Sequence, residues 1–348
     1  MSGTNQLSPD LAQAALILVR DMMCVVDGEH VLVTCDTNTD KSAVEAIVNA
    51  AYALGAKVAS MSLAPALPFQ GGLANPFVPD PVSAAAQNCD AWIDLCMPYM
   101  AGAAVYDLAM KNGRTRYFLG ADIGAQGIVR IFGKADLDQV FAVSDLFNAI
   151  LTESAGKLCH ITTPLGTDVR FKLADPEGLA IERATKPGGY FVPGTVMVIP
   201  ELDSVKGTVI CDSTFHEYYT PLKEPYRFEV DGKIQSVSGG GTELKVIDRA
   251  LKRAGNGEYG NIVHFTCGYH PSARVTGKSF IEDQRAIGCN AVGLGLPQWV
   301  DGGGENHPDC VMQAQSFWID GEQIIDAGVI VAPPDLAKAA SQLQPIYG

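Results

Sequence analysis

Several features that would place this chain in a common class are missing from it. No stretch approaches the roughly 18 consecutive apolar residues that a membrane-spanning helix needs, so we expect no membrane span. The nine cysteines include no Cys-x-x-Cys pair, which disfavours a zinc cage and indicates small buried thiols in a reducing compartment. The amino terminus lacks the basic start and apolar run of a signal peptide, so we expect a cytoplasmic protein.

Positive charge is also scarce. Lys and Arg number 25 against 39 Asp and Glu, which leaves a formal net charge of −14. Such a chain repels the phosphates of DNA and RNA over most of its surface, so we expect no nucleic-acid partner. Apolar residues make up 47% of the 348 residues, which is enough to form the cores of two ordinary domains.

The amino-terminal part, residues 1–155, alternates predicted strands with predicted helices. Four short apolar runs predict strands at "HVLVTC", "KVASMSL", "AWIDLC" and "RYFLG". A helix is expected after Asp40, with one apolar stripe formed by Val44, Ile47, Val48, Ala51 and Leu54. This alternation predicts a Rossmann-like parallel sheet. No Gly-x-Gly-x-x-Gly follows the first strand, which argues against a dinucleotide cofactor.

Residues 156–348 have a different rhythm, in which predicted strands are joined by tight turns. Asp231-Gly232 and Asp320-Gly321 are each expected to form a hairpin turn. One helix is predicted from Thr242 to Ala254. We therefore expect an α/β protein, in which a Rossmann-like domain of residues 1–155 precedes an α+β metal-binding domain of residues 156–348.

Three residues in this second part are candidate metal ligands. The stretch "GGGENHPDCV", residues 302–311, places His307 and Asp309 two positions apart. Pro308 favours an extended backbone at His307, where alternate side chains point to the same side. His264 lies in an apolar predicted strand, where an imidazole is costly unless it has a partner. Two imidazoles and one carboxylate are typical of non-haem Fe(II) oxygenases, although an ordinary surface loop is the simpler interpretation of His307 and Asp309.

The order of motifs resembles that of the M29 aminopeptidases, the aminopeptidase T group. This resemblance is carried by "HFTCGYHP", "FIEDQRAIGCNAVGLG", "NHPD" and "IDGEQIIDAGVIV". Two positions depart from those peptidases, since a glutamate position reads His264 and a histidine position reads Asn290. Both departures disfavour a two-metal peptidase site.

The 2,5-dihydroxypyridine 5,6-dioxygenases, a branch of the same superfamily, resemble the chain at His264 and at the His-x-Asp pair. That resemblance implies that His264, His307 and Asp309 hold one Fe(II), with Zn or Co as the alternative metal. It implies an extradiol-type ring-cleaving dioxygenase, whose partners are O2 and a small hydroxylated N-heteroaromatic similar to 2,5-dihydroxypyridine. We also expect a homo-oligomer. The competing hypotheses are a metal-dependent aminopeptidase or amide hydrolase, and a metal-free binding protein.

Six further residues are predicted to line or support the site. We expect catalytic roles for Tyr190, Glu201 and His270, and substrate-binding roles for Tyr269, Asn290 and Tyr99. The segments "CMPYMAG" and "GGYFVPG" lack the histidines that the resemblance implies there. Tyr99 and Tyr190 are the nearest groups in these segments that can donate a proton. Because the histidines are missing, we expect the substrate to differ from 2,5-dihydroxypyridine itself. Either tyrosine could instead be an ordinary packed aromatic, and Glu201 a surface residue beside a turn.

Overall fold

The computed structural model describes residues 9–175, 182–214, 222–296 and 307–346. Among these residues, no helix combines the length and the apolar character that crossing a lipid bilayer requires.

The chain forms two compact units. Unit 1 contains Met1–Ala135, Glu182–Val192 and Ile346–Gly348, and unit 2 contains Asp136–Ile181 and Pro193–Pro345. These ranges differ from the predicted division at residues 155 and 156 in three places, one of which is the assignment of Ile346–Gly348 to unit 1. A helix of residues 137–153 packs within unit 2, and a strand of residues 188–191 returns to pair in unit 1.

Unit 1 is built around a parallel sheet with the strand order β2-β1-β3-β4-β7. Its elements are α1 (Pro9–Ile17), a helical turn (Leu18–Met22), β1 (His30–Asp36), α2 (Lys41–Ala53), β2 (Lys57–Leu63), a 3-10 turn (Gly71–Phe77), α3 (Asp80–Ala86), β3 (Ala91–Asp94), α4 (Ala104–Lys111), β4 (Arg116–Leu119), α5 (Ala125–Ile128), a further turn (Val129–Gly133) and β7 (Gly188–Phe191). The four predicted strands are β1 to β4, so the predicted parallel sheet is confirmed. Strand β7 comes from the other half of the sequence and was not predicted.

Helix α2 begins after Asp40, whose side chain accepts a hydrogen bond from the backbone N–H of Ser42 at 3.0 Å. Its predicted apolar stripe is wrong in detail. The fully buried side is formed by Ala43, Ala46, Ile47, Ala50 and Ala51, whereas Val44, Val48 and Leu54 are only partly buried. Because alanine side chains are small, this face of the helix can pack closely against the neighbouring elements, and it is the face that is buried.

Unit 2 contains two antiparallel sheets, with the strand orders β11-β10-β9-β6-β5-β15-β16-β17 and β14-β13-β12-β8. Its elements are α6 (Leu137–Glu153), β5 (Leu158–Thr162), β6 (Asp168–Lys172), β8 (Thr195–Val198), a turn (Leu202–Ser204), β9 (Lys206–Cys211), β10 (Tyr226–Asp231), β11 (Lys233–Gly239), a turn (Gly241–Glu243), α7 (Leu244–Ala254), β12 (Asn261–Gly268), α8 (Phe280–Asp283), β13 (Asn290–Gly295), β14 (Asp309–Met312), β15 (Ser316–Ile319), β16 (Glu322–Asp326), β17 (Val329–Ile330) and α9 (Pro334–Gln342).

Both predicted hairpin turns of unit 2 are confirmed. Gly232 has a φ of 71° between β10 and β11, while Asp320 and Gly321 have φ values of 50° and 86° between β15 and β16. The turn at Asp320-Gly321 thus has the positive φ at both central residues that a type I′ turn requires, whereas the first hairpin has it at Gly232 alone. The α/β class, with a parallel sheet followed by antiparallel sheets, is therefore as predicted.

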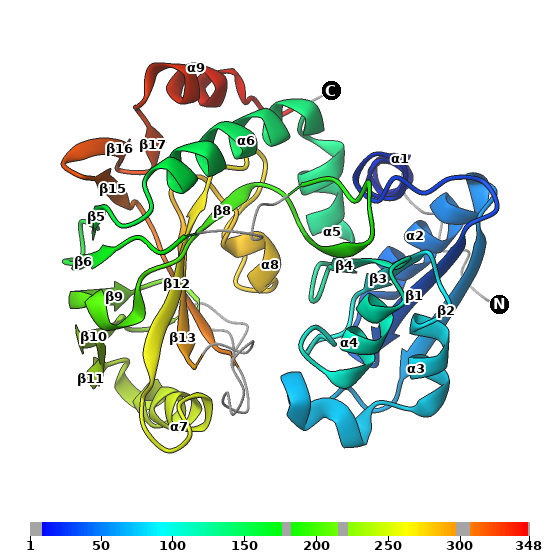
Figure 1. Ribbon diagram of the computed structural model, residues 1–348, viewed down its shortest axis with the longest axis horizontal. Helices are drawn as coiled ribbons and strands as arrows, with labels where there is room; N and C mark the ends of the chain where they lie inside the picture. The colour runs from blue at the N-terminus through cyan, green and yellow to red at the C-terminus, as the bar shows by residue number, and fades with distance from the viewer. Residues whose placement is uncertain (1–8, 176–181, 215–221, 297–306, 347–348) are drawn as a thin grey trace. The chain divides into compact units, whose positions relative to one another are not determined.

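The two sheets of unit 2 contribute to one core. Along β6, Val169 and Phe171 are buried while their neighbours are exposed, as expected for a sheet with one covered face. Phe171 stacks on Phe265 of β12, with ring centroids 4.8 Å apart. All eight residues of β12 are buried, so this strand, drawn in yellow through the middle of unit 2 in Figure 1, lies in the interior.

Candidate metal centre

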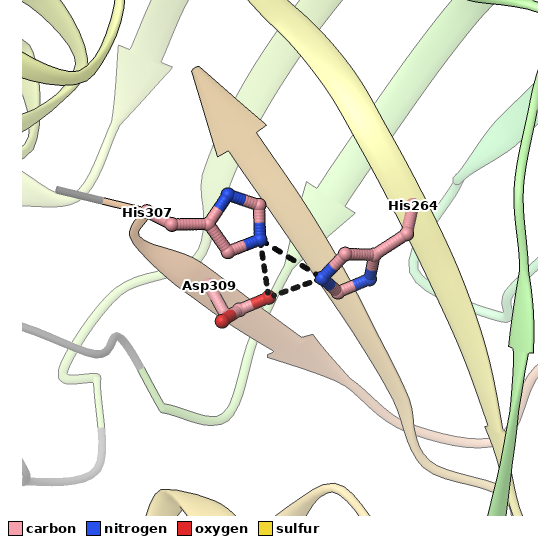
Figure 2. A group of neighbouring side chains, drawn as sticks. All are labelled: His264, His307 and Asp309. Carbon is pink, nitrogen blue, oxygen red and sulfur yellow. Dashed lines mark hydrogen bonds and ion pairs between the residues drawn. The ribbon is translucent and has the colours of Figure 1, made fainter. Parts of the chain in front are cut away.

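Three neighbouring strands of the smaller sheet bring the predicted ligands together. His264 on β12 and Asp309 on β14 both lie directly opposite Gly293 of the strand between them, β13. Directly opposite residues of antiparallel strands project to the same face. His307 precedes Asp309 by two positions, and the carbonyl of Pro308 accepts a hydrogen bond from the backbone N–H of Leu294 at 2.9 Å. All three side chains therefore project to one face of the sheet (Figure 2).

A β-bulge sets the direction of His264. Ile262 pairs with Leu294, but the next pair joins His264 to Gly293, so Val263 is an extra residue on β12. In an unbroken register, Val263 would lie opposite Gly293 and His264 would point to the other face. The bulge therefore turns the imidazole toward Asp309.

The three donor atoms form a small, buried triangle. Nε2 of His264 lies 3.0 Å from Nε2 of His307 and 3.1 Å from Oδ1 of Asp309, and the third side of the triangle measures 3.8 Å. The side chains are at most 8% exposed. Figure 2 shows both rings and the carboxylate converging on one another, and these residues are the one such group within the part of the chain that the structure describes.

This donor set fits a divalent metal ion. Two donors that each bind an ion at about 2.1 Å, at a right angle, lie about 3.0 Å apart, which matches two sides of the triangle. Two neutral imidazoles and one carboxylate leave one positive charge on a divalent ion and leave coordination positions for other ligands. A divalent ion would also balance the negative charge of the buried Asp309 carboxylate. Residues 302–306 of "GGGENHPDCV" lie outside the described residues.

Tyr99 and Tyr190 belong to unit 1, whereas the three candidate ligands belong to unit 2. Tyr99 is buried. Tyr190 is a residue of β7, and its hydroxyl donates a hydrogen bond to the carbonyl of Lys186 at 2.5 Å. Burial raises the pKa of this hydroxyl. The catalytic role of Tyr190 and the substrate-binding role of Tyr99 stay predictions.

The other predicted residues of unit 2 have distinct surroundings. Glu201 has an exposed side chain and begins a short turn, with its carbonyl accepting from Ser204. His270 is fully buried, and its Nδ1 accepts the backbone N–H groups of Ser272 and Ala273 at 3.2 Å each. Tyr269 is also buried, which raises the pKa of its hydroxyl, and this hydroxyl donates to the carbonyl of Val140 at 3.3 Å. None of the three belongs to the triangle of donors.

Asn290 belongs to a buried hydrogen-bond network that includes Gln315, a residue that the sequence did not predict. The Asn290 carbonyl oxygen accepts from the backbone N–H of Thr266 at 3.1 Å, and its amide donates to Gln315 at 2.8 Å. Gln315 in turn donates to the carbonyls of Thr266 and Cys289. These bonds join β12 to the start of β13 beside the bulge. Gln315 follows a short turn, and no motif in the sequence marks it.

A comparison with protein-family models identifies the chain. Residues 18–332 match the model described as NicX, 2,5-dihydroxypyridine 5,6-dioxygenase. A search of curated proteins found no match.

Two solved structures have a similar fold. The 2,5-dihydroxypyridine dioxygenase of Pseudomonas putida KT2440 is 20% identical with a TM-score of 0.74, over 94% of this chain and 98% of that one. Wild-type AmpT of Thermus thermophilus is 15% identical with a TM-score of 0.60, over 93% and 99% of the two chains. The second match agrees with the resemblance to the M29 aminopeptidases. With the family model matching most of its length, the chain belongs to the 2,5-dihydroxypyridine 5,6-dioxygenase family.

Proposed function

We propose that the chain is a mononuclear Fe(II) dioxygenase that opens the ring of a dihydroxypyridine or a closely related hydroxylated N-heteroaromatic. The observation that carries this proposal is the buried triangle of His264, His307 and Asp309 in a chain of this family. When bound there, the iron would supply adjacent coordination positions for a substrate hydroxyl and for O2.

The charge of the donor set supports a hydroxylated ring as substrate. With one carboxylate and two neutral imidazoles around a divalent ion, the site keeps a positive charge. A ring hydroxyl that loses its proton would neutralise that charge inside a buried site, where an unpaired charge is costly. The site therefore favours a substrate that binds through an ionised ring hydroxyl.

Proton transfer is proposed for His270, Tyr190 or Glu201. The backbone N–H groups that bind Nδ1 of His270 require a lone pair on that atom, so the neutral ring carries its proton on Nε2. In this form Nε2 can donate a hydrogen bond, and a proton transfer by His270 would require the two backbone contacts at Nδ1 to break. An acid and a base acting together would give a bell-shaped dependence of kcat/KM on pH.

The hydrolase alternative has less support from the donor set. A two-metal hydrolase needs ligands for two ions about 3.5–4 Å apart. Among the described residues, the group of potential ligands contains Asp309 as its one carboxylate, and an imidazole at position 264 cannot bridge two ions as a glutamate can.

An oxygen electrode distinguishes these functions. Protein loaded anaerobically with Fe(II) is offered 2,5-dihydroxypyridine, hydroxypicolinates and catechol, and separately aminoacyl nitroanilides. We expect uptake of one O2 for each ring lost, measured by the disappearance of the aromatic absorbance, and no nitroaniline release. His264→Ala should abolish both iron content and oxygen uptake while leaving the circular dichroism spectrum unchanged. Metal-dependent release of nitroaniline without oxygen uptake would instead establish the hydrolase.

A further inference from the structure

Gly293 occupies the centre of the candidate metal site, although it has no side chain to offer. It lies on β13 between His264 on β12 and Asp309 on β14, and it is in direct register with both. Side chains on the two outer strands of three project to the same face, but the residue on the middle strand stands between them. They can converge only if the middle residue leaves the space above it open.

The backbone of Gly293 does not itself require glycine. Gly295, two positions further along β13, has a φ of +105°, in the region that favours glycine. Gly293 is absent from the residues with positive φ and lies within a regular strand. An alanine could adopt the same backbone conformation, so the requirement must come from the surroundings.

A side chain at this position would collide with the two imidazoles. A Cβ atom built on Gly293 would lie 2.4 Å from Nε2 of His264 and 2.7 Å from Nε2 of His307, and Cβ contacts below 3.0 Å essentially do not occur. These are the atoms that face the metal in the proposed function. The point that a Cβ would occupy is therefore close to the point where an ion bound to both rings would lie.

No hydrogen bond from a described residue to the second ring nitrogen of His264 fixes the orientation of this imidazole. Its Nδ1 atom is buried and has no hydrogen-bond partner among the described residues. Metal-bound histidines usually donate their other ring nitrogen to an acceptor that fixes the ring. In this chain the bulge at Val263 directs the imidazole toward the donor triangle, where its Nε2 lies 3.1 Å from Oδ1 of Asp309, and the space above Gly293 leaves room for it.

We propose that Gly293 is a positioning residue of the metal site: its missing side chain is the space that admits the metal ion and lets His264 and His307 face it. This inference rests on the proposed function. Gly293 would act in metal binding and would take no part in proton transfer.

The test measures binding of Mn(II), which replaces Fe(II) without reacting with O2, by isothermal titration calorimetry of the metal-free protein. We expect wild type to bind one Mn(II) per chain. Gly293→Ala should bind at least about 100-fold more weakly, at or beyond the upper end of the losses seen when the groups that orient metal ligands are removed. Its circular dichroism spectrum should be unchanged, because the imidazoles are side-chain ends that can rotate away from the new methyl group.

Ala291→Gly is the matched control. It lies on the same strand two positions away, weakens the strand by removing a methyl group, and adds no atom near the imidazoles. It should keep wild-type affinity for Mn(II). Equal affinity of Gly293→Ala and wild type would overturn the inference while leaving the proposed function intact, whereas wild type that binds no Mn(II) would overturn both.

A second set of variants provides a test if Gly293→Ala alone does not fold. Replacing both imidazoles, in His264→Ala/His307→Ala, removes the atoms that the new methyl group meets. Addition of Gly293→Ala to this variant should leave its melting temperature unchanged, which would support the inference. A triple variant that still fails to fold would contradict it, because glycine would then be needed by the sheet and not by the imidazoles.

Discussion

Asp309 decides the charge of the candidate metal site, because it is the single carboxylate in the donor triangle. Asp309→Asn keeps the size of the side chain but removes its negative charge. We expect this variant to bind Mn(II) or Co(II) more than about 100-fold less tightly, since even changes beyond the ligands themselves cost about 10–100-fold. Titration calorimetry of the metal-free protein measures this loss. Glu322→Gln, which removes an exposed carboxylate, is the control for net charge and should bind as wild type does.

Asp283 offers a test of buried charge away from the ligands. Its carboxylate accepts hydrogen bonds from Thr276 and from the backbone N–H of Gly277, and burial raises its pKa to about 6. The pKa in an unfolded chain is about 3.9, so the folded state binds this proton more tightly. The stability contributed by the protonated form is fully present below about pH 4 and is lost as pH rises through about 6.

Asp283→Asn should therefore remove a downward slope in the free energy of unfolding between about pH 4 and pH 6. Urea unfolding of the metal-free protein at several pH values in this window measures the slope. Asp326→Asn, at an exposed position, is the comparison and should keep the wild-type slope. An unchanged slope in Asp283→Asn would show that Asp283 ionises normally.

At the scale of elements, the small sheet depends on side-chain hydrogen bonds where its backbone register is interrupted. Thr266 accepts the backbone N–H of Ala291 at 2.8 Å, and Asn290 accepts that of Thr266. These two side chains join β12 to β13 on the far side of the bulge from Ile262. The bulge that directs His264 is thus held in place by polar groups that are fully buried.

Asn290→Ala tests whether this residue supports the sheet or binds substrate. Loss of its amide leaves the backbone N–H of Thr266 without its acceptor and the carbonyl oxygen of Gln315 without its amide donor, which should lower the free energy of unfolding by about 1–3 kcal/mol. Chemical denaturation measures this cost. A structural role predicts a lower stability with an unchanged KM. A raised KM at unchanged stability would instead establish the predicted substrate contact.

At the scale of the whole molecule, metal binding should stabilise unit 2, because the donors come from strands that converge only in the folded state. An ion at 100 times its dissociation constant adds about 2.7 kcal/mol to the free energy of unfolding. We expect Mn(II) to raise the melting temperature in differential scanning calorimetry, and EDTA to reverse the change. His264→Ala should show no shift, and a shift of equal size in that variant would place the stabilising ion elsewhere.

The sequence alone was sufficient for features that depend on local chemistry. Asp-Gly pairs predict hairpins because positive φ is cheap at these residues, and both hairpins are present. Short apolar runs predict buried strands, and four of the five strands of the first sheet are found where such runs occur. The His-x-Asp spacing predicts two side chains on one side of an extended segment, which is also observed. The buried face of α2 was predicted incorrectly, because it is formed largely by alanines and the prediction relied on the larger apolar side chains.

Tertiary structure decided the features that depend on distant partners. Strand β7 joins β4 across about 70 residues of chain, and no local pattern encodes such a pairing. The bulge at Val263 occurs in an unremarkable apolar strand, so only the register against β13 reveals that His264 faces Asp309. Gly293 looks like an ordinary strand residue until the space above it is seen to be bordered by two imidazoles. Convergence of side chains is a property of three strands in register, and a single strand's sequence does not contain it.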